Sequence, residues 1–197
     1  MTIESITDIQ FLIDNSVEES TELEYKRSFA KENPKWKEEL AKDISAMANA
    51  NGGVLIYGLA EKNVSKGLSL PESIMPIPPT DMTKDQLSQL LSSNITPRIN
   101  NIEISVFPQE GGNVFVLHVP KGITAHQNKI NHLYYIRRNA TVEVMEDYEI
   151  RDVMNRHSNP PLVIDGCGLY KTKNDAYCNK VEYTFMAKIQ NVGHIVC

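Results

Sequence analysis

Three glutamates in the first third of the chain have a spacing that could bring their carboxylates together. Glu19 and Glu24 lie around the start of LEYK, whose alternation of apolar and charged residues predicts a strand. Glu61 directly follows the apolar run 54–60, which predicts a second, buried strand. Carboxylates that converge from two strands could bind Mg²⁺ or Mn²⁺, because these hard cations prefer oxygen ligands. Spacing alone favours the simpler interpretation of a solvated acidic surface, since charge runs are usually exposed.

Basic residues near these glutamates could contact a phosphate. Period-2 alternation places Lys26 on the strand face of Glu24, where its ammonium could pair with a carboxylate or stabilise a phosphate. The other cations expected to contact a nucleic-acid backbone are Arg27, Lys35, Arg137 and Arg138. The net charge of −5 disfavours nucleic-acid binding by the whole surface, but it permits a local basic patch.

The turn around Asn51 and Gly52 has two interpretations. The sequence NANGG at 49–53 follows a helical pattern, so the simpler interpretation is a helix that ends in a left-handed glycine. A tight turn of small residues would also let a phosphate or a base approach the backbone. Asn51 and Gly52 are therefore candidate nucleic-acid contacts as well as helix-ending residues.

Motifs for several other chemistries are missing from the sequence. The phosphate loop GxxxxGK[ST], the serine-hydrolase motif GxSxG and the zinc motif HExxH do not occur. The five histidines lack metal-ligand spacing, and the three cysteines lack CxxC spacing, which argues against a zinc ribbon and a secreted disulfide scaffold. Neither an apolar run of about 18 residues nor a signal peptide is present, so we expect a cytoplasmic protein without a membrane span.

The remaining pattern predicts an α+β domain with a mixed sheet and packed helices, followed by a short β-rich segment. The expected helices cover 5–14, a segment from the N-cap Asn33 and Pro34 to the glycines at 52–53, 83–95 with Thr83 and Gln86 as a capping box, and a segment from Asp147. The expected strands cover 23–26, 54–60, a hairpin at 101–120 and 132–145, with an irregular connection over 62–82. Asn159-Pro160-Pro161 predicts a boundary between a domain at 1–158 and a β-rich segment at 159–197.

Three segments, taken in order, resemble one known family. They are ESTELEYK (19–26), ISAMANANGGVLIYGLAEK (44–62) and LYYIRRNATVEV (133–144). Together they resemble the Schlafen core, also known as an Alba-like DNA-binding domain, over about 15–157. Several Schlafen proteins are endoribonucleases that cut transfer RNA and related structured RNA with three carboxylates and a divalent metal. The resemblance implies that Glu19, Glu24 and Glu61 are these ligands, with Glu61 where the family generally has aspartate and Ala60 at a position that is often acidic.

The residues and the resemblance together predict a metal-dependent endonuclease that acts on RNA in preference to DNA, as a defence effector. In this hypothesis Glu19, Glu24 and Glu61 bind Mg²⁺ or Mn²⁺ and form the catalytic site with Lys26. The alternative is a non-catalytic nucleic-acid-binding module of a transcriptional regulator or a larger assembly. A third hypothesis is an oligomerisation or sensing domain whose partner lies in a C-terminal part beyond residue 197. We also expect a homo-oligomer or a partner bound through the C-terminal segment.

Overall fold

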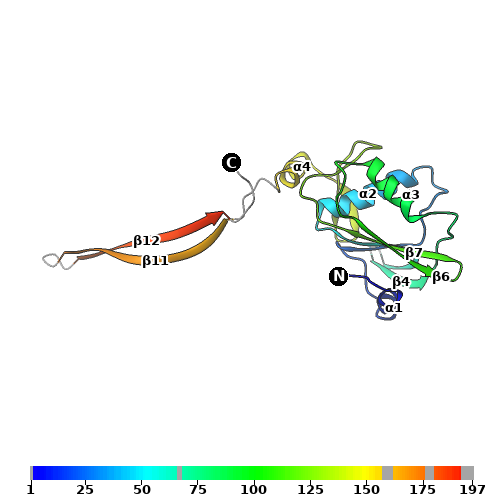
Figure 1. Ribbon diagram of the computed structural model, residues 1–197, viewed down its shortest axis with the longest axis horizontal. Coiled ribbons are helices and arrows are strands. Elements are labelled where there is room, and N and C mark those ends of the chain that lie inside the picture. The colour runs from blue at the N-terminus through cyan, green and yellow to red at the C-terminus, as the bar shows by residue number, and fades with distance from the viewer. Residues whose placement is uncertain (1, 66–67, 157–161, 176–179, 192–197) are drawn as a thin grey trace. The chain divides into compact units, whose positions relative to one another are not determined.

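The computed structural model describes residues 2–65, 68–156, 162–175 and 180–191 (Figure 1). The chain divides into two compact units, Met1–Met154 and Asn155–Cys197. The predicted boundary at Asn159-Pro160-Pro161 lies outside the described residues.

The first unit is built around a four-stranded mixed sheet. Its strands, in spatial order, are β1 (Leu23–Lys26), β2 (Gly53–Tyr57), β7 (Gly112–Val119) and β6 (Glu103–Gln109). β1 runs parallel to β2, with Glu24 opposite Leu55, whereas β2–β7 and β7–β6 are antiparallel. The helices and this mixed sheet confirm the predicted α+β fold.

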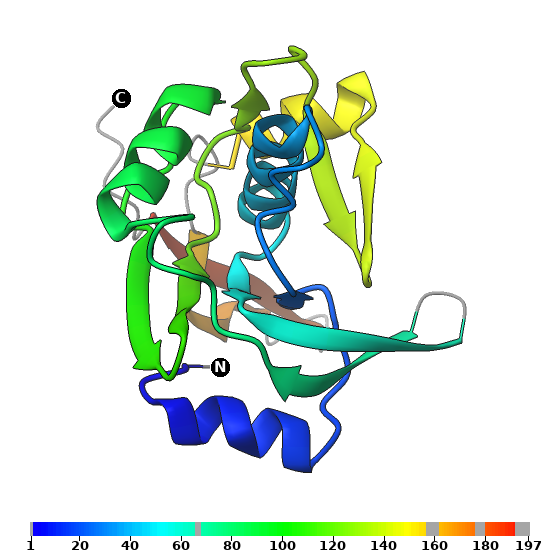
Figure 2. The same ribbon diagram turned by 90° about the vertical axis from the view of Figure 1, so that its right-hand side faces the viewer.

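Helices cover both faces of the sheet (Figure 2). Leu55 and Phe115 belong to the core cluster that contains side chains of α2 (Trp36–Asn49) and α3 (Lys84–Asn94). Ile56 and Val116 belong to a second cluster, which contains side chains of α1 (Ile6–Asp14). Burial on both faces explains why β2 and residues 114–117 of β7 are continuous apolar runs in the sequence. Tyr25 faces α1, so its neighbours in β1 face α2.

The start of α2 differs from the prediction. The helix begins at Trp36 with Lys35 at the N-cap, two residues beyond the expected first helical residue Pro34, so the predicted cap at Asn33 is wrong. Asn33 instead forms a turn in front of the helix. Its side-chain oxygen accepts the N–H of Lys35 at 2.9 Å, and its carbonyl accepts the N–H of Trp36 at 3.0 Å.

Two glycines after α2 have backbone conformations that side chains rarely adopt. Gly52 has φ +78° and Gly53 has φ +148°. A Cβ at Gly53 would lie 2.4 Å from the carbonyl oxygen of Glu22, and one at Gly52 would lie 2.6 Å from that of Val119. The glycines therefore allow close backbone contacts where the chain turns from α2 into β2.

The segment after β2 is more regular than predicted. Gly58, with φ +94°, separates β2 from β3 (Leu59–Ser65), so the single strand expected over 54–60 is wrong. β3 pairs with β4 (Leu68–Ile74) in an antiparallel hairpin, so the irregular connection expected over 62–82 is wrong for its first part. Pro71 lies within β4. Because proline is uncommon inside strands, this residue favoured the prediction of an irregular connection.

The other elements of the first unit largely follow the sequence. α3 has the predicted capping box, in which the N–H of Gln86 donates to Thr83 Oγ1 at 3.2 Å, and the hairpin β6–β7 is confirmed. α4 (Asp147–Met154) begins at the predicted residue. The single strand expected at 132–145 is instead an antiparallel pair, β9 (Tyr135–Arg138) and β10 (Thr141–Val144). Two short strands, β5 (Ile95–Thr96) and β8 (Gln127–Asn128), also pair.

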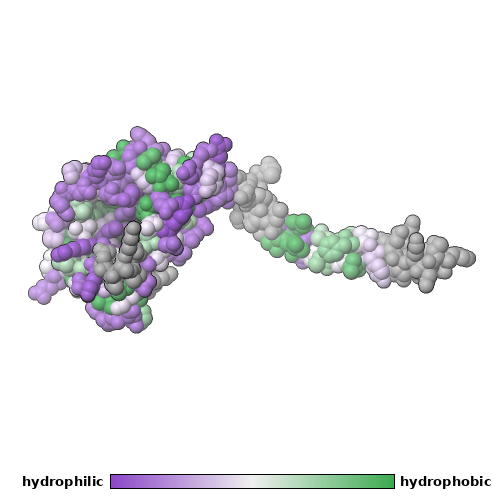
Figure 3. Space-filling model, turned by 180° about the vertical axis from the view of Figure 1, so that it is seen from behind, coloured by the Kyte–Doolittle hydropathy of each residue, from purple (hydrophilic) through white to green (hydrophobic). Residues whose placement is uncertain are grey.

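The second unit contains an antiparallel pair, β11 (Leu162–Asp175) and β12 (Lys180–Asn191), so the strands expected in this segment are confirmed. Large apolar side chains of this pair are exposed, among them Leu169 at 70% and Phe185 at 64% (Figure 3). Among the described residues, no helix combines the length and apolar character that a membrane crossing requires.

Candidate functional site

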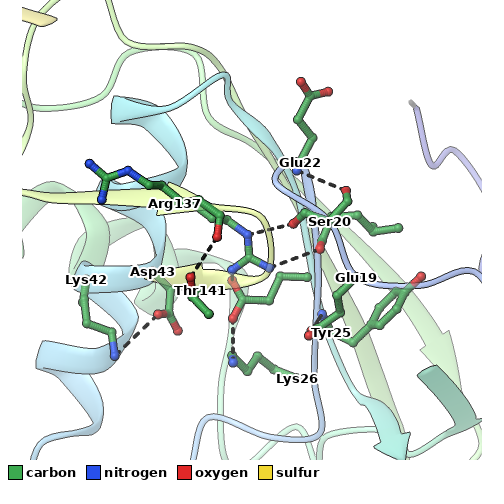
Figure 4. A network of polar contacts seen from close by, with 12 residues as sticks. Glu19, Ser20, Glu22, Tyr25, Lys26, Lys42, Asp43, Arg137 and Thr141 are labelled. Atoms are coloured by element: carbon green, nitrogen blue, oxygen red, sulfur yellow. Dashed lines mark hydrogen bonds and ion pairs between the residues drawn. The ribbon is translucent and has the colours of Figure 1, made fainter. Parts of the chain in front are cut away.

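Glu24 is the centre of a buried ionic cluster. Its side chain leaves the α2 face of β1, and the residue is only 4% exposed. Arg137 Nη1 lies 2.6 Å from one carboxylate oxygen, and Lys26 Nζ lies 2.6 Å from the other. Figure 4 shows Lys26 and Arg137, which come from two different strands, β1 and β9. The predicted position of Lys26 on the Glu24 face is therefore confirmed, and its ammonium is paired with that carboxylate.

Arg137 lies in the interior and binds the chain around Glu24. This residue of β9 is 2% exposed, and its Nε donates to the carbonyl of Ser20 at 2.9 Å. Its Nη2 also donates to the carbonyl of Leu23 at 3.3 Å. A guanidinium that is buried and bonded in this way does not face a nucleic acid, so the expected backbone contact by Arg137 is replaced by a structural role.

Asn49 holds the strand of Arg137 in place. Its amide nitrogen donates to the carbonyls of His126 and Tyr135, each at 2.8 Å, and its oxygen accepts the N–H of His126 at 2.7 Å. Asn49 is fully buried at the last position of α2, so these bonds connect that helix to β9. The pattern NANGG indicated a helix end or a turn open to a ligand, and this role of Asn49 was missed because the distant carbonyl partners are not visible in a local pattern.

Glu19 and Glu61 lie beside this cluster and are both half-buried. One oxygen of Glu19 accepts the N–H of Tyr25 at 2.9 Å, and this bond caps the open edge of β1. Burial raises the pKa of Glu19 above its usual value, and the negative charges of Glu61 and Glu24 raise it further, against the hydrogen bond from Tyr25 and the charge of Lys26. Each of the three predicted glutamates therefore interacts electrostatically within one region of the protein.

The sequence did not indicate a fourth carboxylate, Asp43 of α2. It is 7% exposed and interacts with the charges of both Glu24 and Lys26. Burial raises the pKa of Asp43 to about 7, and the charge of Glu24 adds to this effect against the ammonium groups of Lys26 and Lys42. Asp43 lies three residues after Leu40 and one before Ile44, on the apolar stripe of α2, and a carboxylate on a buried stripe was the available signal.

Lys26 is the cation that these carboxylates share. Burial lowers the pKa of its ammonium, but the charges of Glu24, Asp43 and Glu61 outweigh burial, so the pKa lies above its usual value. Its side chain is 33% exposed. Lys26 is therefore a permanently charged group at the border between the buried cluster and the surface.

The other predicted contact residues lie apart from this cluster or on its border. Arg27 and Lys35 are exposed on the connection between β1 and α2. Arg138 forms ion pairs with Glu143 and Glu149. The side chain of Asn51 is exposed and accepts a hydrogen bond from Lys121 at 3.2 Å, whereas Gly52 is buried.

The region that contains these residues matches a known protein family. Residues 19–146, about two thirds of the chain, match the family described as Schlafen, AlbA_2. The chain belongs to this family. Membership supports a function related to nucleic acids, and the predicted resemblance is confirmed. No curated protein matches the chain.

Several solved structures are similar to this Schlafen-family chain. The DIP2311 protein of Corynebacterium diphtheriae aligns with a TM-score of 0.53 and 15% identity over 76% of this chain, which shows a shared fold. This chain spans only 31% of that protein's length. The N-terminal domain of a RecG-related protein of Nitrosomonas europaea is 26% identical over 60% of this chain and 74% of that domain, with a TM-score of 0.41.

The Schlafen resemblance raises the question of whether these carboxylates fit a metal ion. Within the described ranges, no three His, Cys, Asp or Glu side chains form a group that could hold one. Both oxygens of Glu24 are bound by cations of the protein itself. Each oxygen of Glu24 therefore already has a cationic partner, and a metal ion bound by Glu24 would share the carboxylate with Lys26 and Arg137.

Proposed function

We propose that the first unit is a nucleic-acid-binding domain of the Schlafen type. The observation that carries this proposal is the concentration of exposed cations directly after β1. Residues 27–37 contain four exposed basic side chains and one glutamate, although the whole chain has a net charge of −5. These cations are Arg27, Lys31, Lys35 and Lys37.

Such a cluster suits a phosphate backbone. Each Lys or Arg that neutralises a phosphate releases condensed counterions, and this release drives binding that weakens as salt increases. Lys26 adds a permanent positive charge where this connection leaves the sheet. Family membership points to the same class of ligand.

A second candidate function is metal-dependent cleavage, with RNA as the favoured substrate and defence as the biological role. The observation that favours it is the electrostatic interaction of Glu19 with both Glu61 and Glu24. In this case the three glutamates would hold Mg²⁺ or Mn²⁺, which would supply a Lewis acid and an activated water. The pairing of Glu24 with Arg137 and Lys26 makes this the second candidate.

One experiment separates the two functions. The purified full chain is incubated with total RNA, plasmid and single-stranded DNA in Mg²⁺, Mn²⁺ or EDTA, and both retention and cleavage are measured. We expect binding in EDTA that weakens with salt, by a slope of about −0.7 to −0.9 per phosphate contacted.

Cleavage that needs metal and is lost in Glu19→Gln would establish the second candidate in place of simple binding. The matched control is Glu103→Gln, an exposed glutamate on β6. Absence of salt-sensitive binding to every probe would refute both functions.

A further inference from the structure

Trp36 is the only tryptophan of the chain, and two lysines flank its ring. The ammonium groups of Lys31 and Lys37 each lie 5.6 Å from the ring centroid, within the range of a cation–π contact. Trp36 is half-buried and packs against the core cluster of α2 and α3. Lys31 also donates a hydrogen bond to the carbonyl of Asp81, in the segment before α3. These contacts place two positive charges close to an aromatic ring at the protein surface.

A cavity of about 350 Å³ lies beside this ring. Besides Trp36 and its two lysines, it is lined by Met82, Gln86, Gln89, Leu90 and Ser93. Its volume falls within the range of about 300–1,000 Å³ that is typical of small-ligand sites. The aromatic and apolar side chains could contact the face of a ring, and the two glutamines and the serine could hydrogen-bond to its polar edge. We call this cavity the Trp36 groove.

Trp36 connects the Trp36 groove with a second cavity beside the ionic cluster of Glu24. Trp36 also lines a second cavity, of about 200 Å³, whose wall includes Lys26 and Asp43. Trp36 is therefore a wall that the Trp36 groove shares with a cavity that reaches Lys26. The second cavity thus connects an aromatic site outside the predicted motif with Lys26 of the motif.

We propose that the Trp36 groove binds one unpaired base of a single-stranded nucleic acid, which stacks on Trp36 while its flanking phosphates contact Lys31 and Lys37. Stacking on an aromatic side chain requires a base that is free of its own helix, so the groove selects single strands over duplexes. The two ammonium groups match the negative charge of the backbone on either side of the base. This inference rests on the proposed nucleic-acid binding and specifies its ligand.

The single tryptophan allows a direct test on the unmodified protein. Oligo(U) and oligo(dT) of about 12 nucleotides are titrated into the full chain, and Trp fluorescence is followed together with the anisotropy of a labelled oligomer. We expect quenching that saturates at the same concentration as the anisotropy. A blunt duplex of equal length should bind more weakly and leave the fluorescence nearly unchanged.

The outcomes distinguish this inference from the proposed function. Binding seen by anisotropy without any change in Trp36 fluorescence would overturn the groove and leave the proposed function standing. A duplex that quenches as strongly as the single strand would also overturn it. Lack of binding by either readout would refute both.

Variants test the stacking and the charges separately. Trp36→Ala should weaken binding of the oligomers about 5- to 100-fold, whereas Trp36→Phe should retain most of the affinity because it keeps a ring. Lys31→Gln with Lys37→Gln should reduce the slope of log K against log salt by about 1.4, the value for two phosphate contacts on a single strand.

The matched controls are Tyr148→Ala, an aromatic residue that is 70% exposed on α4, and Lys129→Gln, an exposed lysine on another segment. If Trp36→Ala fails to fold, the phenylalanine and lysine variants still decide the question. Equal effects of the groove and control variants would refute the proposal.

Discussion

The carboxylate of Glu24 is neutralised from inside the protein. Removing a carboxylate from water costs several kcal/mol, and this cost is offset only when counter-charges and hydrogen bonds are well placed. Arg137 and Lys26 supply both, one at each oxygen. Glu24 therefore stabilises the position of β9 relative to β1, whatever ligand the protein binds.

We expect Glu24→Gln to lower the free energy of unfolding by about 3 kcal/mol, because it leaves the buried guanidinium of Arg137 without its counter-charge. Arg137→Met should have a similar cost. The double variant should lose less than the sum of the two single variants, since neither charge is then left alone. Urea unfolding of the three variants measures this coupling, and strictly additive losses would show that the pair is not coupled.

Asp43 should make stability depend on pH. Its pKa is about 7 in the folded protein against an ordinary value of 3.8, so the folded state holds the proton more tightly. The stability that protonated Asp43 contributes is therefore present below about pH 4 and is lost as the pH rises to about 7. We expect Asp43→Asn to stabilise the protein at pH 8 by roughly 2 kcal/mol and to flatten the profile between pH 4 and 7.

Thermal unfolding between pH 4 and 8 checks this expectation. Asp152→Asn, at an exposed position on α4, is the control and should follow the wild-type profile. An unchanged slope in Asp43→Asn would show that the proton is taken up elsewhere.

Site residues were predictable where the signal lay in neighbouring residues of the sequence, and not where it lay in tertiary contacts. Alternation in LEYK correctly placed Lys26 beside Glu24, because strand faces follow directly from the sequence. The two arginines after Tyr135 could not be told apart in the sequence, yet Arg137 is buried and Arg138 is partly exposed. That difference arises from β9 packing near β1 and α2, which is a tertiary contact. Trp36 belongs to no sequence motif. The contacts of its ring with Lys31 and Lys37 mark it as a candidate binding residue in the structure.

At the scale of elements, the turn from α2 into β2 sets the position of β1. The carbonyl of Glu22 accepts the N–H of Val54 at 2.8 Å, and the missing Cβ of Gly53 allows this approach. The register that follows places Glu24 opposite Leu55. A side chain at this turn would therefore disturb the strand that carries the ionic cluster.

Gly53→Ala should destabilise the protein by more than about 2 kcal/mol, because the new methyl group would lie 2.4 Å from the Glu22 carbonyl. Gly111→Ala is the control. It also has a positive φ, at +87°, but nothing lies within 4 Å of its Cβ position, so we expect a loss of only about 1 kcal/mol. Chemical denaturation compares the two, and equal losses would show that backbone strain alone matters.

Elements with strong local signals were predictable, and elements defined by pairing were not. The capping box of Thr83 and Gln86 marked the start of α3 correctly. The β3–β4 hairpin was missed because a proline lies in β4 and because its register contains irregularities, one of them at Glu61. Pairing at such positions is decided by the neighbouring strand, which a local pattern does not contain.

At the scale of the whole molecule, the two units differ in how they bury apolar side chains. Each of the three core clusters is formed by residues before Asn155. The described side chains of β11 and β12 are mostly exposed, and an isolated two-stranded hairpin is marginally stable in water. The first unit therefore contains the elements of an independently stable domain.

A chain that ends at Arg156 should fold and unfold cooperatively with nearly the midpoint of the full chain. The reason is that its core clusters are intact. A peptide of residues 157–197 should lack a cooperative transition. Circular dichroism during heating measures both. A large loss of midpoint in the shorter chain would show that the second unit stabilises the first.

The partners Glu24 and Arg137 are 113 residues apart, and this separation has a consequence for synthesis on the ribosome. At about 5–20 residues per second, roughly 6 to 20 s pass between the addition of the glutamate and the addition of the arginine. During that interval β1 and α2 can emerge, but Glu24 lacks the guanidinium that later buries with it. A nascent chain interrupted before Arg137 would contain all three glutamates of the motif but not the arginine that neutralises Glu24. The ionic cluster can therefore assemble only when synthesis of the first unit is nearly complete.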